Sequence, residues 1–187
     1  NQDGGNSVPT ALGDWGGIYL AQGTATIANT EIRYGGSVSL GALRNVGATT
    51  TITRTRFWSN MIGLYMTGGT LDLRDSEFNQ NDTGVRYYAG TITMNGNSLV
   101  NNSGYGVLNT SLTHTVVDAR NNWWGDASGP RHPVYNPDGL GNAVSDYVLF
   151  DPWSTCFRDT CHSSVLFLPG IMGSRLYETK DGDEEEL

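Results

Sequence analysis

The stretch Gly69-Thr-Leu-Asp-Leu-Arg-Asp-Ser-Glu-Phe78 returns, with substitutions, as Gly90-Thr-Ile-Thr-Met-Asn-Gly-Asn-Ser-Leu99. Each copy begins at a turn-forming glycine and places one apolar residue five positions before another, as in Leu73 and Phe78. Thr, Asp, Arg, Asn and Ser occupy the positions between these apolar residues. This pattern is typical of short period-2 strands joined by turns, and it leaves no room for a helix of about ten residues. The stretch therefore predicts strands that alternate with bends.

The pattern is part of a longer repeat. It occurs in four successive units, which begin at Gly23, Ala48, Gly69 and Gly90. A second series of glycines has the same spacing, because 84 − 63 = 21 and 106 − 84 = 22 separate Gly63, Gly84 and Gly106. Repeats of this length are typical of solenoids, in which each unit forms one turn of a coil. We expect an all-β solenoid of about five to six rungs.

Polar and apolar residues recur at matching positions of these units. Asn60, Asn81 and Asn102 lie 21 residues apart, so stacking at roughly 4.8 Å would place their amides in one column. Such a column can hydrogen-bond to itself and to carbonyl groups that a bend leaves unpaired, which is a structural role. The apolar columns should fill the interior; they are Ile27, Ile52, Leu73 and Met94, then Ile32, Phe57, Phe78 and Leu99, then Ile18, Leu64, Val85 and Val107.

Two segments after the repeats are also distinctive: Asn121-Asn-Trp-Trp-Gly-Asp-Ala-Ser-Gly-Pro130 and Val144-Ser-Asp-Tyr-Val-Leu-Phe-Asp-Pro-Trp153. Together they resemble the closing segment of secreted bacterial and archaeal β-helix repeat proteins. From about Trp15 to Trp153 the chain resembles a right-handed parallel β-helix of the pectin-lyase-like superfamily. This resemblance implies one β-helix domain over residues 1–153. We expect its open C-terminal end to be capped by large side chains, those of Trp123, Trp124, Phe150 and Trp153.

The composition changes after this domain. An unbroken apolar run, Ser164-Val-Leu-Phe-Leu168, suits a strand buried on both faces. The phrase from Val165 to Leu176 resembles the first core strand and loop of α/β-hydrolase lipases and acyltransferases, notably the lecithin:cholesterol acyltransferase-like group. The resemblance implies that Gly170, Ile171 and Met172 belong to a loop that helps to bind an oxyanion. Because the chain contains no Gly-x-Ser-x-Gly elbow, we expect residues 164–187 to be only the start of such a domain, without activity of its own.

A short linker, residues 154–163, contains both cysteines of the chain. Cys156 and Cys161 have no further cysteine or suitably spaced histidine pair with which to build a zinc site, so a disulfide is the favoured interpretation. A disulfide indicates an oxidising setting, namely the extracellular space, the cell surface or the periplasm. We expect no metal and no cofactor. The acidic run from Asp181 to Glu186 is interpreted as a solvated loop.

The bulk charge excludes some partners. A formal net charge of −8 and a pI near 4.6 argue against nucleic acid and against anionic membrane surfaces, because both attract basic patches. No apolar stretch reaches the roughly 18 residues of a membrane span. The partner that we expect is therefore a polysaccharide or a cell-surface glycan.

Two outward surfaces are candidates for function. Alternation along the strand turns Asp72 and Arg74 to the same outer face, where a carboxylate and a guanidinium could act in a polysaccharide lyase or a glycoside hydrolase. The other surface carries aromatic rings and a guanidinium that can bind sugars, those of Tyr19, Trp58, Tyr65, Arg86 and Tyr88. Three hypotheses therefore remain open: a carbohydrate-associated binding or scaffold module, a polysaccharide-active enzyme, and the N-terminal part of an acyl-ester hydrolase or acyltransferase.

Overall fold

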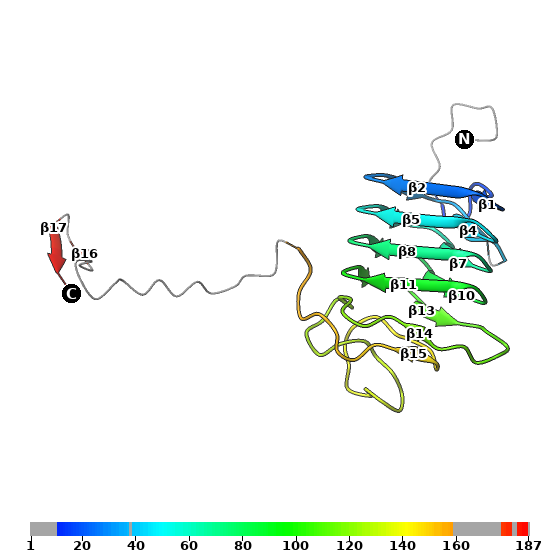
Figure 1. Cartoon of the computed structure of the whole chain (residues 1–187). Helices are drawn as coiled ribbons and strands as arrows, with labels where there is room; N and C mark the ends of the chain where they lie inside the picture. The colour runs from blue at the N-terminus through cyan, green and yellow to red at the C-terminus, as the bar shows by residue number, and fades with distance from the viewer. Residues whose placement is uncertain (1–10, 38, 159–176, 181–182, 187) are drawn as a thin grey trace.

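A computed structural model describes residues 11–37, 39–158, 177–180 and 183–186. Residues 14 to 153 form a coil of short parallel strands, stacked one rung upon the next (Figure 1). The predicted fold class, an all-β parallel β-helix, is confirmed. The hydrolase-like strand from Val165 and the predicted oxyanion residues Gly170, Ile171 and Met172 lie outside the described residues.

Three parallel sheets form the walls of the coil. The first sheet has the strand order β1 (Ile18–Leu20), β4 (Leu43–Asn45), β7 (Ile62–Met66), β10 (Thr83–Tyr87) and β13 (Tyr105–Asn109). The second sheet contains β2 (Thr24–Ala28), β5 (Thr49–Thr53), β8 (Thr70–Arg74) and β11 (Thr91–Asn95). The third sheet contains β3 (Glu31–Arg33), β6 (Arg56–Trp58), β9 (Glu77–Asn79) and β12 (Ser98–Val100).

Four rungs contain a strand in all three sheets, slightly fewer than the five to six expected. After β13 the chain forms only the two-residue strand β14 (Val117–Asp118), which pairs in parallel with β15 (Val148–Leu149). Isolated bridges continue the walls, from Ser98 to Trp123 and from Val107 to Val144. The sequence from residue 110 onward departs from the repeat, so the last part of the coil is irregular.

The apolar columns meet in a narrow core. Phe57 and Phe78 stack face to face with ring centroids 4.6 Å apart, as their identical place in successive rungs requires. Ile18 is an exception to the predicted interior column, because 39% of its surface is exposed on the edge strand β1. Trp15 packs against the core at this end, and its indole N–H donates to the carbonyl of Arg33 at 2.7 Å.

Asn60, Asn81 and Asn102 form one buried, hydrogen-bonded column. The side-chain amide of Asn60 donates to Oδ1 of Asn81 at 3.0 Å, and that of Asn81 donates to Oδ1 of Asn102 at 2.9 Å. The backbone N–H of Asn60 also donates to Oδ1 of Asn81, and the backbone N–H of Asn81 also donates to Oδ1 of Asn102. Asn142 extends the column by one more step, because its Oδ1 accepts from the amide of Asn102 at 2.6 Å. The column thus ties four turns of the chain together.

A second polar column was not foreseen from the sequence. Oδ1 of Asn122 accepts from the amide of Asn97, Oδ1 of Asn97 accepts from the backbone N–H of Ser76, and Oγ of Ser76 accepts from that of Thr55. All four residues are buried. They stand at the bend between the second and third sheets, where the turning backbone would otherwise leave buried groups unpaired.

The bends themselves use left-handed backbone conformations. One residue of each rung, between the second and third sheets, has a positive φ, and these residues are Asn29, Arg54, Asp75, Gly96 and Asn121. A second set follows the third sheet, namely Tyr34, Ser59, Gln80 and Asn101. Only glycine and asparagine adopt this conformation readily, so the arginine and glutamine in these sets indicate that the coil imposes it.

The C-terminal end of the coil is filled by two of the predicted cap residues and covered by a third. Trp124 and Phe150 are buried in the core. Trp153 packs against Gly129, where an added Cβ would lie 2.4 Å from the indole ring, and its Nε1 donates to the carbonyl of Ala127 at 3.0 Å.

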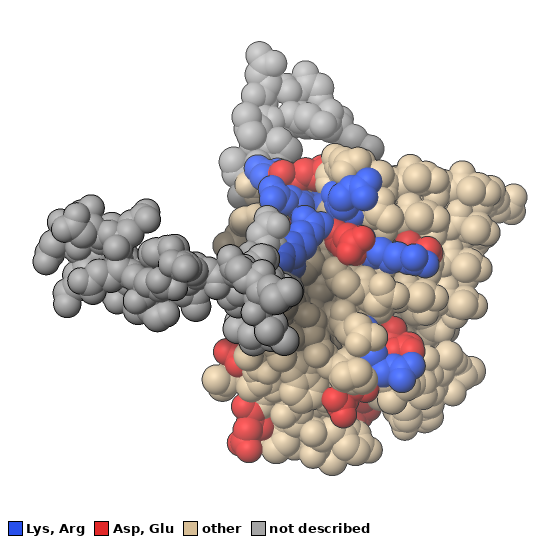
Figure 2. All heavy atoms as spheres, turned by 60° about the vertical axis from the view of Figure 1, so that its left-hand side comes forward, with Lys and Arg blue, Asp and Glu red and all other residues tan. Residues whose placement is uncertain are grey.

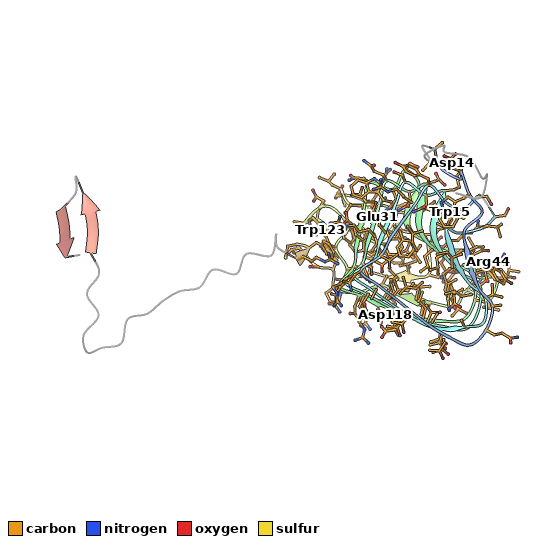
Figure 3. The ribbon with its side chains drawn as sticks, turned by 90° about the horizontal axis from the view of Figure 1, so that it is seen from above. Asp14, Trp15, Glu31, Arg44, Asp118 and Trp123 are labelled. Carbon is orange, nitrogen blue, oxygen red and sulfur yellow. The ribbon has the colours of Figure 1, made fainter. Side chains whose placement is uncertain are left out.

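Trp123 does not belong to this cap, contrary to expectation. Alternation after Asn122 turns its side chain outward, where it lines a recess of about 230 Å³ together with Asp75 and Phe157. Seen along the stack, Trp123 lies at the side of the coil opposite Arg44 (Figure 3). The acidic run also differs from expectation, because β17 (Asp183–Glu186) pairs antiparallel with β16 (Tyr177–Lys180) and is a strand.

Candidate functional site

Four long side chains form a column on the outer face of the first sheet. The strand registers place Tyr19 beside Arg44, Arg44 beside Tyr65, and Tyr65 beside Arg86. Tyrosine and arginine therefore alternate over four successive strands, β1, β4, β7 and β10. We call these four residues the Tyr–Arg column.

Strand alternation explains why the column faces solvent. Leu64 and Met66 on either side of Tyr65 are fully buried, so Tyr65 itself must point away from the core. The same holds for Arg44 between Leu43 and Asn45. The core positions thus fix the outward position of the column on a rigid, three-walled support.

The rings and guanidinium groups of the column lie on one another. The guanidinium carbon of Arg44 is 5.8 Å from the ring centroid of Tyr19 and 5.4 Å from that of Tyr65. The guanidinium of Arg86 lies 5.1 Å from the same Tyr65 ring. These distances are those of cation–π contacts. Nε of Arg44 also donates to Oγ1 of Thr67 at 3.4 Å, which further fixes its direction.

This arrangement changes what the column can offer to a ligand. Arg44 and Arg86 flank the Tyr65 ring, so that ring is not free to stack on a sugar as expected from the sequence. Only Tyr19, 59% exposed at the end of the column, keeps a largely open ring. The column instead places two guanidinium groups and two tyrosine hydroxyl groups along one line; Arg44, Tyr65 and Arg86 are half-buried, and Nε of Arg86 is buried. Such a line of donors suits carboxylate or sulfate groups.

Three of the five predicted sugar-binding residues are brought together, and two are not. Trp58 lies on β6 in the third sheet, where its indole N–H donates to Oε1 of Gln80 at 2.7 Å. Tyr88 follows β10 at the bend and is 40% exposed. Trp58 therefore belongs to another surface, because the coil turns between the first and third sheets. Tyr88 lies just beyond the end of β10, outside the four-strand register of the column.

Arg44 was missed in the sequence. Its signal was present, since 65 − 44 = 21 and 86 − 65 = 21 give it the spacing of the repeat. The extra residues before it obscured the register. In the structure, Ser37 and Leu40 exchange backbone hydrogen bonds and form a tight turn that projects from the second rung.

The second candidate surface, around Asp72 and Arg74, is an ion pair. Nε of Arg74 lies 2.6 Å from Oδ1 of Asp72, and the register neighbours of Asp72 are Thr51 and Thr93. Space-filling spheres show several acidic side chains next to basic ones on a largely uncharged face, with further acidic side chains alone near its lower edge (Figure 2). No second carboxylate stands beside Asp72 in the sheet, so the arrangement lacks the carboxylate pair of a glycoside hydrolase.

A similar pair stands lower on the coil. Arg120 binds Asp118 through two hydrogen bonds, of 2.9 Å and 2.6 Å, and these lower the pKa of the Asp118 carboxyl from its usual value. Because both groups are exposed, this is a modest surface interaction. In the part of the chain that the structure describes, no group of three or more His, Cys, Asp or Glu side chains could hold a metal ion.

The predicted disulfide stays untested. Cys161 lies outside the described residues, so its bond to Cys156 remains a prediction. Cys156 itself lies beside the coil in the segment that follows Trp153, and Ser154 N–H donates to the carbonyl of Asn122 at 2.9 Å. Among the described residues, no helix is long and apolar enough to cross a membrane.

Stacked rungs, polar columns at the bends and short parallel strands in three sheets define the class of parallel β-helix repeat proteins. A comparison with protein-family models makes the assignment specific: residues 14–123 match the family described as "Right handed beta helix region". The match covers more than half of the chain, so the chain belongs to this family and its coil is right-handed. No curated protein and no solved structure matches the chain.

Proposed function

We propose that this β-helix is an extracellular or cell-surface module that binds acidic polysaccharide along the Tyr–Arg column. The observation that carries the proposal is the alternation of two arginines and two tyrosines over four strands at one rung per step. Guanidinium groups bind carboxylate and sulfate in a bidentate manner, whereas tyrosine hydroxyls bond to sugar hydroxyls.

The rigidity of the support favours binding of an extended polymer. Equivalent residues of successive parallel strands are about 4.8 Å apart, so the donors form a straight row along the stack. The cation–π contacts hold the guanidinium groups in place before a ligand arrives, which reduces the side-chain entropy that binding would remove. A polymer that lies along the stack would meet all four side chains at once.

The overall acidity of the chain does not oppose the proposal. Five of the 19 acidic residues lie in the run from Asp181 to Glu186, outside the β-helix, while the column itself carries two positive charges. At physiological salt, charges more than a Debye length of about 8 Å away are largely screened, so a ligand on the column mainly senses the charges of the column itself. Acidity elsewhere would, however, make the binding salt-dependent and specific to this face.

The test uses one polymer in two charge states. Oligogalacturonate and its fully methyl-esterified form share a backbone and differ in charge, and calorimetry would compare their binding to the 187-residue chain. We expect the acidic form to bind at least about tenfold more tightly, because the ester removes the partner of both guanidinium groups. Arg44→Gln should weaken that binding about three- to tenfold. Arg131→Gln, at an exposed arginine outside the column, is the matched control and should leave it unchanged.

The outcomes distinguish the proposal from its alternatives. Equal binding of both forms would exclude charge recognition by the column. Absence of binding to sulfated and carboxylated polymers alike would leave a rigid scaffold. Release of unsaturated or reducing-end products from the polymer would favour the polysaccharide-active enzyme.

The larger protein to which the module belongs is proposed to be a secreted lipase- or esterase-like hydrolase. The phrase Val165-Leu-Phe-Leu-Pro-Gly-Ile-Met-Gly-Ser-Arg-Leu176 supports this proposal. The module would then hold such a hydrolase near a polysaccharide surface. Sequence beyond Leu187 tests the proposal: a Gly-x-Ser-x-Gly elbow followed by Asp and His supports it, and continued β-repeats contradict it.

A further inference from the structure

The C-terminal end of the coil contains a cavity of about 860 Å³ that belongs to neither candidate surface. Its volume lies within the range of small-molecule sites. Ten residues line it, namely Val116, His132, Tyr135, Asp146, Tyr147, Val148, Leu149, Phe150, Asp151 and Trp153.

The lining has a distinct chemistry. Four aromatic rings and three aliphatic side chains provide an apolar wall, and two carboxylates, those of Asp146 and Asp151, provide negative charge. No arginine or lysine is among the ten residues. The cavity is therefore opposite in sign to the Tyr–Arg column, and a ligand of the column would not suit it.

His132 does not neutralise this charge. Its Nδ1 accepts hydrogen bonds from the backbone N–H groups of Val134 and Tyr135, at 3.2 Å and 3.1 Å, so the ring proton is on Nε2. Nε2 lies 3.3 Å from Oδ1 of Asp146. The nitrogen that carries the proton thus faces the Asp146 carboxylate, whose side chain is three-quarters exposed.

Several rings of the cavity are held in place before any ligand binds. Trp153 is fixed by its hydrogen bond to Ala127 and by its packing on Gly129. Tyr147 stacks on His114 with centroids 4.5 Å apart. The buried ring of His132 lies against Tyr135, at 4.9 Å between centroids. Fixed aromatic faces beside carboxylates attract a cation through the ring quadrupole and through direct charge.

We propose that this cavity binds a small organic cation, of the quaternary or methylated ammonium class. The apolar body of such a ligand would rest on the rings of Tyr135, Tyr147 and Trp153. Its positive charge would face the carboxylates of Asp146 and Asp151. The proposal is independent of the polysaccharide function, since it uses other residues at another end of the coil.

The experiment compares two probes of the same shape. Choline and 3,3-dimethylbutan-1-ol differ in the positive charge on the quaternary centre, and the indole N–H signal of Trp153 in the 187-residue chain reports their binding by NMR titration. We expect choline to shift this signal in a saturable manner and to bind at least about fivefold more tightly than the neutral alcohol.

Two variants locate the charge. Asp146→Asn keeps an oxygen that can accept from Nε2 of His132, so the cavity retains its shape while it loses one charge; choline binding should weaken about threefold or more. Asp138→Asn changes an exposed aspartate of the neighbouring loop that does not line the cavity, and binding should be unchanged.

Three outcomes would overturn the proposal: no saturable shift with choline, equal binding of the neutral alcohol, or equal weakening by both variants. If a polypeptide segment occupies the cavity instead, choline would give no saturable shift.

Discussion

The side chain of Asn81 bonds to polar groups of the rung before it and of the rung after it, since its Nδ2 also donates to Oδ1 of Asn102. Its Oδ1 accepts from the backbone and the amide of Asn60, and its Nδ2 donates to the carbonyl of Phe57 at 3.0 Å. All of these groups are buried, so none can turn to water instead. The structural role of Asn81 could be predicted from the sequence, because asparagine recurs every 21 residues at Asn60, Asn81 and Asn102. A stacked column of side chains explains this regular recurrence.

Asn81→Ala should therefore lower the free energy of unfolding by about 2–4 kcal/mol, because it leaves a buried N–H group and a buried C=O group without partners. Urea denaturation measures the change. Asn95→Ala, at an exposed asparagine of β11, is the control and should alter stability by less than about 0.5 kcal/mol. Similar losses in the two variants would contradict the structural role of the column.

Substitution by glycine should have opposite effects on stability at Arg54 and at its neighbour Thr53. Arg54 has a φ of +46°, which glycine adopts without steric strain, so Arg54→Gly should raise the free energy of unfolding by about 0.5–1 kcal/mol. Thr53 lies in the extended strand β5, so Thr53→Gly should lower it by about 1 kcal/mol. Thermal denaturation of both variants measures the two signs. Destabilisation by Arg54→Gly would show that its hydrogen bond to Asn29, at 2.9 Å, outweighs the strain.

At the scale of single elements, the short strand β14 illustrates how exposed ion pairs act on this coil. Its Asp118 binds Arg120 two positions later, in the same manner as Asp72 binds Arg74 in β8. In each case strand alternation turns both side chains to the same outer face. Such pairs need no catalytic explanation.

The Asp118 carboxyl should respond to the loss of its partner. Its folded-state pKa lies below the usual 3.8 because Arg120 hydrogen-bonds to it, so its favourable contribution to stability is present above that value and is lost as the pH falls through the folded-state pKa. In Arg120→Ala the pKa should rise towards 3.8, and the pH dependence of stability below about pH 4 should weaken. NMR titration of the carboxyl carbon checks this. Arg74→Ala is the control, and an equal rise there would indicate a general field effect.

At the scale of the whole molecule, the coil is a one-dimensional stack in which each rung contacts only its neighbours. Stability in such a stack is a sum of local terms, so damage at one end need not reach the other. Trp153 belongs to the last turns, where it covers Gly129.

Trp153→Ala should therefore reduce amide hydrogen-exchange protection in β14, β15 and residues 126–153, while β5 and β8 keep theirs. Hydrogen exchange followed by mass spectrometry resolves these segments. Trp58→Ala, at a tryptophan on the outer face of the third sheet, is the matched control and should not reproduce this pattern. Uniform loss of protection in the Trp153 variant would mean that the coil unfolds as a single unit.

Much of this fold could be predicted because the interior repeats. Leu73, Met94, Phe57 and Phe78 face the same environment in successive rungs, so their spacing alone gives strand, register and core. The outward surface is predicted less well, because the repeat spacing does not show which sheet carries an outward residue. Trp58 and Tyr65 both point outward, but they lie on different sheets. Arg44 was missed for a related reason: the projecting turn at Ser37 and Leu40 hides its register.

The irregular parts were the least predictable. The second polar column changes residue type from Thr55 to Ser76 to Asn97, so no single letter recurs to reveal it. The outward turn of Trp123 depends on where the strand alternation restarts after Asn121, which tertiary packing decides. The cavity at the C-terminal end gathers Asp146 and His132 from segments that do not repeat at all.

Because the rungs follow one another at a constant spacing, the number of rungs sets the length of the Tyr–Arg column. Each added unit of about 21 residues would extend the row by one side chain without disturbing those already in place, because every new strand adds to the end of each sheet. Under the proposed polysaccharide function, the number of repeats would set how many successive sugar units the coil binds. Duplication of one repeat inside the coil is then expected to lengthen the preferred oligosaccharide by one step and to leave the recognition chemistry as it is.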